Sequence, residues 1–249
     1  MENRTEIRNS LFKKLSDVAK KGPIPAIGQG DQAVGMTLLH ALGIEYSSST
    51  KPNYFGIVVT AHRRPITGRG NRVNLFAQVP NWLLSNCKSS REIVELYGYD
   101  LSPNKRQLYC TVNSRHLNSQ GLILEIDREQ DYLLEIAKGA GKHSYIATWQ
   151  INKLKERLVE THPETIWVKA VTFERNGQEF FHYRECVYSG APKENEFTEL
   201  LETGTITLDH LISLNNGKVI EKGPLFKIRP TNLELLFPNP IKYDLMSLD

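Results

Sequence analysis

The stretch Asn53-Tyr54-Phe55-Gly56-Ile57-Val58-Val59-Thr60 is the part of the sequence that decides the fold. Residues 54 to 61 form a short apolar run rich in β-branched side chains, which is typical of a buried strand. A helical pattern lies upstream, from Asp31 as the expected N-cap through about Leu42, and Gly43 closes it. We therefore expect a helix followed by a buried strand in this part of the chain.

The remaining sequence alternates irregularly between helical and strand patterns. Apolar positions at helical spacing predict a first helix over residues 5 to 21, which the segment Gly22-Pro23-Ile24-Pro25 ends as a linker. Further helices are expected near 89–97, 150–160, 194–202 and 231–236, and further strands over 107–113, 121–126, 131–136, 166–174, 179–188, 205–212 and 224–228. The pattern predicts an α/β (α+β) fold with one mixed central sheet flanked by helices.

Composition limits the class of protein. With 249 residues, 40% of them apolar and 24% charged, the chain has the make-up of a globular protein with a sizeable core. Its three cysteines are widely spaced, so they predict buried thiols rather than a disulfide framework or a zinc site. The N-terminus lacks an apolar signal-peptide core and no segment approaches the roughly eighteen apolar residues of a membrane span. A cytoplasmic protein without a membrane partner is expected.

Positive charge is concentrated directly after the predicted strand. Residues 61–72 contain four arginines (Arg63, Arg64, Arg69 and Arg72), two glycines and no acid, although the net charge of the whole chain is only +3. Arginine forks on such a loop can follow a phosphate backbone, and glycines allow the main chain to come close. Arg115 can extend the same field of charge. A solvated basic loop without a ligand is the alternative interpretation.

Seven segments of the chain match one family pattern in order and spacing. They are Gly35–Ile44 for G-x-x-L-E-x-x-x-G-V, Asn53–Arg63 for D-x-x-x-x-E-x-K-x-x-R, Asn74–Phe76, Glu95–Tyr99 for R-F-G-Y, Arg115–Leu122, Tyr145–Trp149 and Gly223–Arg229. On these segments the chain resembles the MvaI/BcnI family of monomeric type II restriction endonucleases, relatives of the mismatch-repair nickase MutH. The resemblance extends over about residues 28 to 236.

This resemblance implies a core of the PD-(D/E)XK type. It implies a single restriction-endonuclease-like domain over residues 1–249, with a catalytic-type lobe and a DNA-recognition lobe around a DNA cleft. In the family, a helix glutamate and the Asp, Glu and Lys of the strand motif form a Mg²⁺-dependent phosphodiesterase. Those four positions are Leu39, Asn53, Val58 and Thr60 in this sequence, so all of them depart from the pattern.

The departures remove the groups that Mg²⁺ requires. Mg²⁺ prefers hard oxygen ligands, including one or two carboxylates, in octahedral geometry. Asn53 offers one neutral oxygen, Val58 none, and Thr60 a hydroxyl that does not ionise usefully. Loss of one electrostatic group in an active site typically costs about 10²–10³ in rate. We therefore predict no metal site, no cofactor and no cleavage at these positions.

A relocated metal site is the alternative, and it would make the chain an active Mg²⁺-dependent type II restriction endonuclease. Its candidate ligands are Asp31, His40, Glu45, His62 and Asp100. His62 lies two residues beyond Thr60 on the same face of the predicted strand, where it can act as a base or contact a phosphate. The simpler interpretations are that His62 belongs to the basic loop and that Asp31 only caps its helix.

The DNA-holding residues of the family pattern are present. Arg63, Arg64, Arg69 and Arg72 lie where the family chain passes the DNA backbone, and Lys227 and Arg229 lie where the family places base-contacting residues. Arg115 completes the predicted set. The sequence thus favours a monomeric protein that binds double-stranded DNA without cutting it, with an active nuclease or a methyltransferase as candidate partner. An interaction protein that only inherited the fold is a third alternative.

Overall fold

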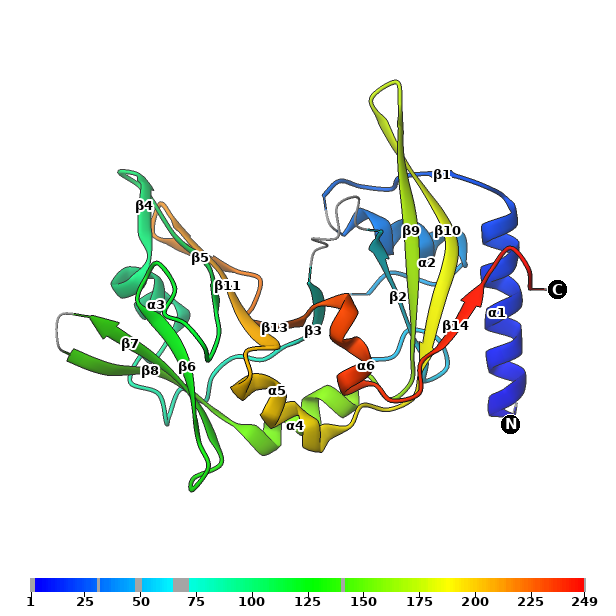
Figure 1. The fold of residues 1–249 in the computed structure, drawn as a ribbon. Helices are drawn as coiled ribbons and strands as arrows, with labels where there is room; N and C mark the ends of the chain where they lie inside the picture. The colour runs from blue at the N-terminus through cyan, green and yellow to red at the C-terminus, as the bar shows by residue number, and fades with distance from the viewer. Residues whose placement is uncertain (1–2, 31, 48–50, 65–71, 140–141, 249) are drawn as a thin grey trace. The chain divides into compact units, whose positions relative to one another are not determined.

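The computed structural model describes residues 3–30, 32–47, 51–64, 72–139 and 142–248. Contacts divide the chain into two compact units that are each assembled from separate segments. Unit 1 consists of Met1–Asn71, Glu160–Pro192 and Phe237–Asp249, and unit 2 consists of Arg72–Val159 and Lys193–Leu236. Figure 1 shows the elements of both units, and each unit is described by itself below.

Unit 1 is built on a mixed five-stranded sheet. Its strands, in spatial order, are β1 (Ile24–Pro25), β10 (Gln178–Ser189), β9 (Thr165–Arg175) and β2 (Val58–Arg63), and β14 (Ile241–Asp244) also pairs with β10. β2 runs parallel to β9, whereas the other pairs are antiparallel. The position of β2 therefore depends on the start of β9, more than a hundred residues further along the chain.

Two helices cover one face of this sheet. They are α1 (Arg4–Lys20) and α2 (Ala33–Ala41). α1 begins with a capping box between Asn3 and Glu6, which satisfies backbone N–H groups that have no partner inside the helix. Leu11 and Leu15 of α1 are buried in one core cluster with apolar residues of α2, β2, β9 and β10. This side is the core face of the sheet, and the opposite side is its outer face.

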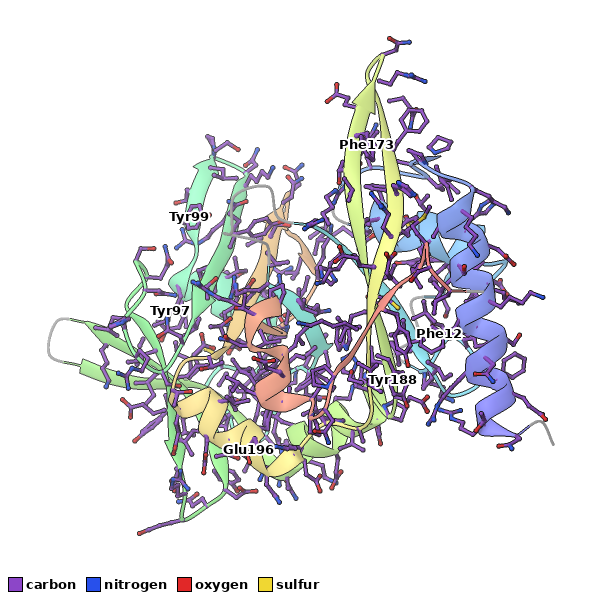
Figure 2. All side chains as sticks on the ribbon, turned by 45° about the vertical axis from the view of Figure 1, so that its right-hand side comes forward. Phe12, Tyr97, Tyr99, Phe173, Tyr188 and Glu196 are labelled. Atoms are coloured by element: carbon purple, nitrogen blue, oxygen red, sulfur yellow. The ribbon has the colours of Figure 1, made fainter. Side chains whose placement is uncertain are left out.

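The β9–β10 hairpin is the longest feature of the unit 1 sheet. Its strands pair from Gln178–Arg175 to Ser189–Thr165, and Asn176 and Gly177 form the connection with φ values of 54° and 73°. An Asn-Gly pair suits this turn because both positions need a left-handed backbone. In Figure 1 the hairpin extends beyond α1 and α2, and Figure 2 shows Phe173 near its end.

Unit 2 contains two antiparallel sheets. The six-stranded sheet has the order β3 (Val73–Ala77), β13 (Leu225–Ile228), β11 (Ile206–Asn215), β5 (Lys105–Val112) and β4 (Tyr99–Ser102), with β12 (Lys218–Glu221) paired to β11. The three-stranded sheet consists of β6 (Leu122–Asp127), β7 (Tyr132–Gly139) and β8 (Lys142–Gln150). Helices α3 (Ser90–Tyr97), α5 (Glu194–Glu202) and α6 (Leu233–Leu236) and the 3-10 turn Pro230–Asn232 lie in unit 2, and α4 (Ile151–Thr161) spans the boundary between the units.

Aromatic side chains form the core of unit 2. Phe76 and Phe226 stack with ring centroids 4.9 Å apart, and Trp149 meets Phe226 edge to face at 6.1 Å. The indole N–H of Trp149 donates to the Gln78 carbonyl, so its polar atom is satisfied although the ring is buried. This packing holds β3, β13 and β8 in fixed positions relative to one another.

The structure confirms the predicted mixed α and β class and most of the predicted elements. The predicted mixed sheet is the sheet of unit 1, and the two antiparallel sheets of unit 2 are additional. The predicted strand over residues 54–61 begins only at Val58, because Tyr54 and Ile57 pair across a tight turn. The predicted linker at Gly22–Pro25 includes the two residues of β1. None of the described helices combines the length and the apolar character needed to cross a membrane.

Candidate nucleic-acid interface

A pinned turn stands in place of the first half of the predicted strand. Phe55 and Gly56 adopt φ values of 43° and 83°, and a phenylalanine in this region is strained. The guanidinium of Arg4, on α1, donates to the Phe55 carbonyl at 2.6 Å and to the Gly56 carbonyl at 3.0 Å. α1 therefore helps to fix the turn that leads into β2.

The side chain of Asn53 is used entirely by the backbone of Val59. Its Oδ1 accepts from the Val59 N–H at 2.8 Å, and its Nδ2 donates to the Val59 carbonyl at 2.9 Å. An amide can satisfy both groups, whereas a carboxylate has no donor. The Asn53 side chain thus pairs with the backbone of β2 as a neighbouring strand would. Its oxygen is engaged in this pairing and does not face a ligand.

The other three motif positions present no carboxylate. Leu39 is buried in the core cluster of unit 1. Val58 and Thr60 alternate with buried Val59, so they lie on the outer face of the sheet, next to Thr165 and Trp167 of β9. Trp167 is fully buried and stacks on His162, with ring centroids 5.2 Å apart. The neighbours of Val58 and Thr60 on the sheet provide no carboxylate, which does not fit Mg²⁺.

Glu164 is the carboxylate nearest in the chain to the start of β9. Its negative charge is balanced by two arginines. Its backbone carbonyl accepts from the Val58 N–H, while its carboxylate accepts from Arg4 at 2.8 Å and Arg8 at 2.5 Å. Burial alone raises the pKa of Glu164, but the hydrogen bonds from Arg8 and Arg4 outweigh it and hold the pKa below its usual value. Within the described residues, no group of three or more His, Cys, Asp or Glu side chains is placed to hold a metal ion.

His62 lies on β2 rather than in a basic loop. It is half-buried on the outer face, opposite Lys169 of β9. Burial, together with the positive charge of Lys169, lowers the pKa of His62 to about 4. The imidazole is neutral at neutral pH, and its buried Nδ1 makes no hydrogen bond within the described structure. Its role as a base or phosphate contact stays a prediction.

A row of charged residues crosses the outer face beside His62. Lys169 of β9 pairs with Glu185 of β10, which pairs with Asp244 of β14. A cavity of about 390 Å³ lies over this row, and Arg64 and Lys242 are among its other lining residues. We name this cavity, lined by Arg64, Lys169, Val171, Arg184, Glu185, Cys186, Val187, Lys242, Tyr243 and Asp244, the outer-face pocket. Sequence reasoning predicted only Arg64 of this set.

Strand alternation separates the predicted backbone-contacting arginines. Arg64 follows His62 to the outer face, whereas Arg63 points to the other side, where it makes two hydrogen bonds with Glu179 at 3.0 and 2.9 Å. The Arg63 guanidinium also lies over the Phe181 ring, 5.2 Å from its centroid. Arg63 thus has a structural role in unit 1, and its contact with DNA stays a prediction. Arg69 and Asp31 lie outside the described residues.

Unit 2 has a polar hollow of its own. Its volume is about 650 Å³, and it is lined by Arg72, Thr111, Asn113, Arg115, His116, Gly204, Thr205, Thr207, Arg229, Thr231 and Asn232. Arg72, Arg115 and Arg229 come from three distant parts of the sequence, and all three were predicted to contact DNA. The predicted residue Lys227 lies on β13, two residues before Arg229. We name this site the unit 2 hollow.

One aspartate organises the cations of the hollow. Asp209 of β11 forms ion pairs with Arg72 at 2.8 Å and with Lys227 at 3.0 Å. Arg72 also donates to the hydroxyls of Thr111 and Thr207. These bonds fix the Arg72 guanidinium in one place, whereas Arg229 is exposed at the end of β13. The hollow therefore combines a rigid arginine with an accessible one.

Gly204 determines the path of Arg115. It has a φ of 68° after α5, and a Cβ at this position would lie 2.8 Å from the Arg115 side chain. The side-chain stem of Arg115 therefore lies against the glycine, and Arg115 remains exposed. Asn113 and Thr207 also line the hollow, and no sequence motif identified them. The polar residues of strand positions 207 and 209 were the signal that could have identified the polar face of β11.

Comparisons with known proteins identify the family and the fold of this chain. The sequence model of the MvaI/BcnI restriction endonuclease family matches residues 12–237. The chain belongs to this family. A search of curated proteins finds no match.

Two solved structures of the MvaI endonuclease resemble this MvaI/BcnI family member, each at 17% sequence identity. The complex of MvaI with its cognate DNA substrate gives a TM-score of 0.80 and covers 94% of this chain and 96% of that chain. MvaI in the absence of DNA gives a TM-score of 0.56 over 97% of this chain and 99% of that chain. The predicted restriction-endonuclease-like fold is therefore confirmed.

Proposed function

We propose that this MvaI/BcnI family member binds double-stranded DNA and does not hydrolyse it at the family's motif positions. The observation that supports this proposal is the chemistry around Val58 and Thr60. Their neighbours on the sheet, Thr165 and Trp167, carry no charge, the amide of Asn53 is bonded to Val59, and Leu39 is buried in the core. Such an environment offers Mg²⁺ no charged oxygen, so the metal-bound water of the family's reaction has no place to form.

The unit 2 hollow supports DNA binding. Three arginines line a polar concave surface, and its remaining lining is mostly Thr and Asn, which also donate to phosphates and bases. Arginine recognises guanine through O6 and N7 in the major groove, and each such pair contributes about 1–3 kcal/mol of discrimination. We assign base recognition to Arg229 and Arg115. We assign to Arg72, which is held by Asp209, a role in holding the strands of the hollow in place. MvaI was solved in complex with its cognate DNA substrate, which supports double-stranded DNA as the ligand.

The proposal includes a specific mode of action. The protein acts as a monomer, as a single domain whose catalytic-type and DNA-recognition lobes enclose the duplex. A protein that holds a site without cutting it acts by covering that site or by recruiting a partner. An active nuclease or a DNA methyltransferase fits the second role.

The direct test is incubation of the purified protein with long unmodified phage DNA in Mg²⁺, in Mn²⁺ and in EDTA. We expect retarded but intact DNA in all three, because binding needs no metal and the motif holds none. Discrete fragments that require metal would overturn the non-cleaving proposal and would establish a relocated site. Substituting Asp31→Asn and His62→Ala would then identify its ligands.

A second measurement tests the assignment of base recognition. Arg229→Gln should lower discrimination between the selected target and other sequences by about 1–3 kcal/mol, because it removes a bidentate contact. The matched control is Arg91→Gln, at an exposed arginine of unit 2 that pairs with Glu95 and donates to the Gly217 carbonyl. Binding to selected and random duplexes is compared by fluorescence anisotropy. Equal losses on both duplexes would assign Arg229 to the backbone instead.

A further inference from the structure

The outer-face pocket contains more positive than negative charge. Arg64, Lys169, Arg184 and Lys242 line it together with two acids, Glu185 and Asp244. All of these residues belong to unit 1, and the rows of the sheet place Lys169, Glu185 and Asp244 side by side. A concave surface of this charge attracts a small anion or an anionic group of a larger molecule.

Glu185 occupies the centre of this charge pattern. Its carboxylate is 3.7 Å from Arg64 and 3.8 Å from Lys169, which is longer than a direct charge-assisted hydrogen bond of about 2.7–2.9 Å. Asp244 stands directly opposite Glu185 on the neighbouring strand, and like charges in this position repel one another. The acid therefore balances two cations without holding either of them tightly.

We propose that the outer-face pocket binds a phosphate group and that Glu185 stands in for this phosphate when the pocket is empty of ligand. The proposal rests on the proposed function, since a phosphate of bound DNA is the expected ligand. When a phosphate enters, Arg64 and Lys169 exchange the Glu185 carboxylate for the phosphate oxygens. A fork-shaped guanidinium and a point-like ammonium together suit such an oxygen-rich group.

The position of the pocket supports this assignment. Lys169 is two residues beyond Trp167 on β9, so the pocket lies about 7 Å along the sheet from the degenerate motif row. The same outer face therefore retains cations next to the place where the family's metal would have met the DNA backbone. Direct binding by Arg64 and Lys169 gives this face a metal-independent contact with phosphate.

The test is a double-mutant cycle on DNA affinity in EDTA, measured with full-length protein. Glu185→Gln should tighten DNA binding roughly threefold to fivefold, because the Glu185 carboxylate no longer competes with the phosphate for Arg64 and Lys169. In an Arg64→Gln, Lys169→Met background this gain should disappear, because the freed cations are absent. The background itself should reduce the slope of log K against log salt by about one to two.

Glu174→Gln is the matched control. Glu174 is exposed on the opposite face of β9, five residues from Lys169, so it reports the general effect of removing one negative charge. If Glu185→Gln gains no more than Glu174→Gln, or gains equally in the altered background, the proposal is wrong. If thermal unfolding shows that the protein with Lys169→Met is not folded, Arg64→Gln alone serves as the background. Arg64 is largely exposed, so this single substitution should not disturb the fold.

Inorganic phosphate provides an independent readout. Calorimetric titration of the protein with inorganic phosphate should show weak binding, and Arg64→Gln should reduce it. Titration with chloride at the same ionic strength, without sulfate, is the reference. Phosphate binding without any DNA binding would support the pocket and overturn the proposed function. DNA binding without coupling between Glu185 and the two cations would leave the proposed function intact and overturn the pocket.

Discussion

Asn53 illustrates how one residue can keep a structure while its chemistry changes. The family pattern places an aspartate here, and an aspartate shares with asparagine its length and one accepting oxygen. In this chain the second atom of the group is a donor, and it bonds the Val59 carbonyl at 2.9 Å. The substitution therefore improves the local hydrogen bonding of β2 at the position where the family pattern requires negative charge.

We expect Asn53→Asp to destabilise the protein rather than restore metal binding. The new carboxylate oxygen would face the Val59 carbonyl without a proton between them, and Val58 and Thr60 would still supply no ligand. The free energy of unfolding should fall by about 1 kcal/mol, at the low end of the cost of an unsatisfied group because Asn53 is only partly buried. Urea unfolding measures this loss, and Asn53→Ala, which removes both bonds, is the comparison. Unchanged stability together with Mg²⁺-dependent protection would contradict the expectation.

Neighbouring arginines also show what the sequence can and cannot predict for single residues. Arg63 and Arg64 appear equivalent in the sequence, but alternation along β2 sends one to Glu179 and the other to the outer-face pocket. Arg64 is exposed, and its contact with DNA stays a prediction. Lys169 and Glu185 were missed because their proximity depends on the register of β9 and β10, which a local pattern does not specify.

At the scale of elements, helices were predicted well and short strands were not. The helix predicted over 194–202 agrees with α5, because its apolar spacing is a local property. β1 has only two residues and is a strand solely because β10 lies beside it. In the apolar run 54–61, Tyr54, Ile57 and Val59 are buried as predicted, but Phe55 is 70% exposed and part of the run is a turn. Burial alone does not distinguish a strand from a turn packed on a core.

The junction of α1 with the start of β9 should control the acid stability of unit 1. Glu164→Gln removes the charge that Arg4 and Arg8 share, and we expect a loss of about 2 kcal/mol near neutral pH. This is less than the 3–5 kcal/mol of a fully buried pair, because both arginine side chains are more than one third exposed.

The pH dependence has a definite sign. The folded-state pKa of Glu164 is lowered, so its contribution is present above the unfolded pKa and is lost as pH falls through the folded pKa. Wild type should therefore lose stability over this acidic window more steeply than Glu164→Gln. Thermal unfolding from neutral to acidic pH measures the difference, with Glu174→Gln as control. Parallel curves for wild type and Glu164→Gln would show that the ion pair does not stabilise the fold.

At the scale of the whole molecule, the sequence predicted the family. Arg72, Arg115 and Arg229 were each predicted to contact DNA, and this contact stays a prediction. The six-stranded sheet brings them to one hollow, which was not predicted. The family pattern was informative because it combines segments that lie far apart in the sequence, whereas local propensity describes only neighbouring residues. The outer-face pocket had no such guide, since the family pattern describes the residues that this chain has replaced.

The segmental make-up of the two units has a consequence for how such a protein can arise. The chain passes between the units four times, at residues 71–72, 159–160, 192–193 and 236–237. Deleting one stretch of the gene therefore cannot discard one unit and spare the other, nor can a simple fusion transplant the hollow into another protein. Under the proposed function, cleavage is lost and DNA binding is kept through point substitutions, and the residues Leu39, Asn53, Val58 and Thr60 are of that kind.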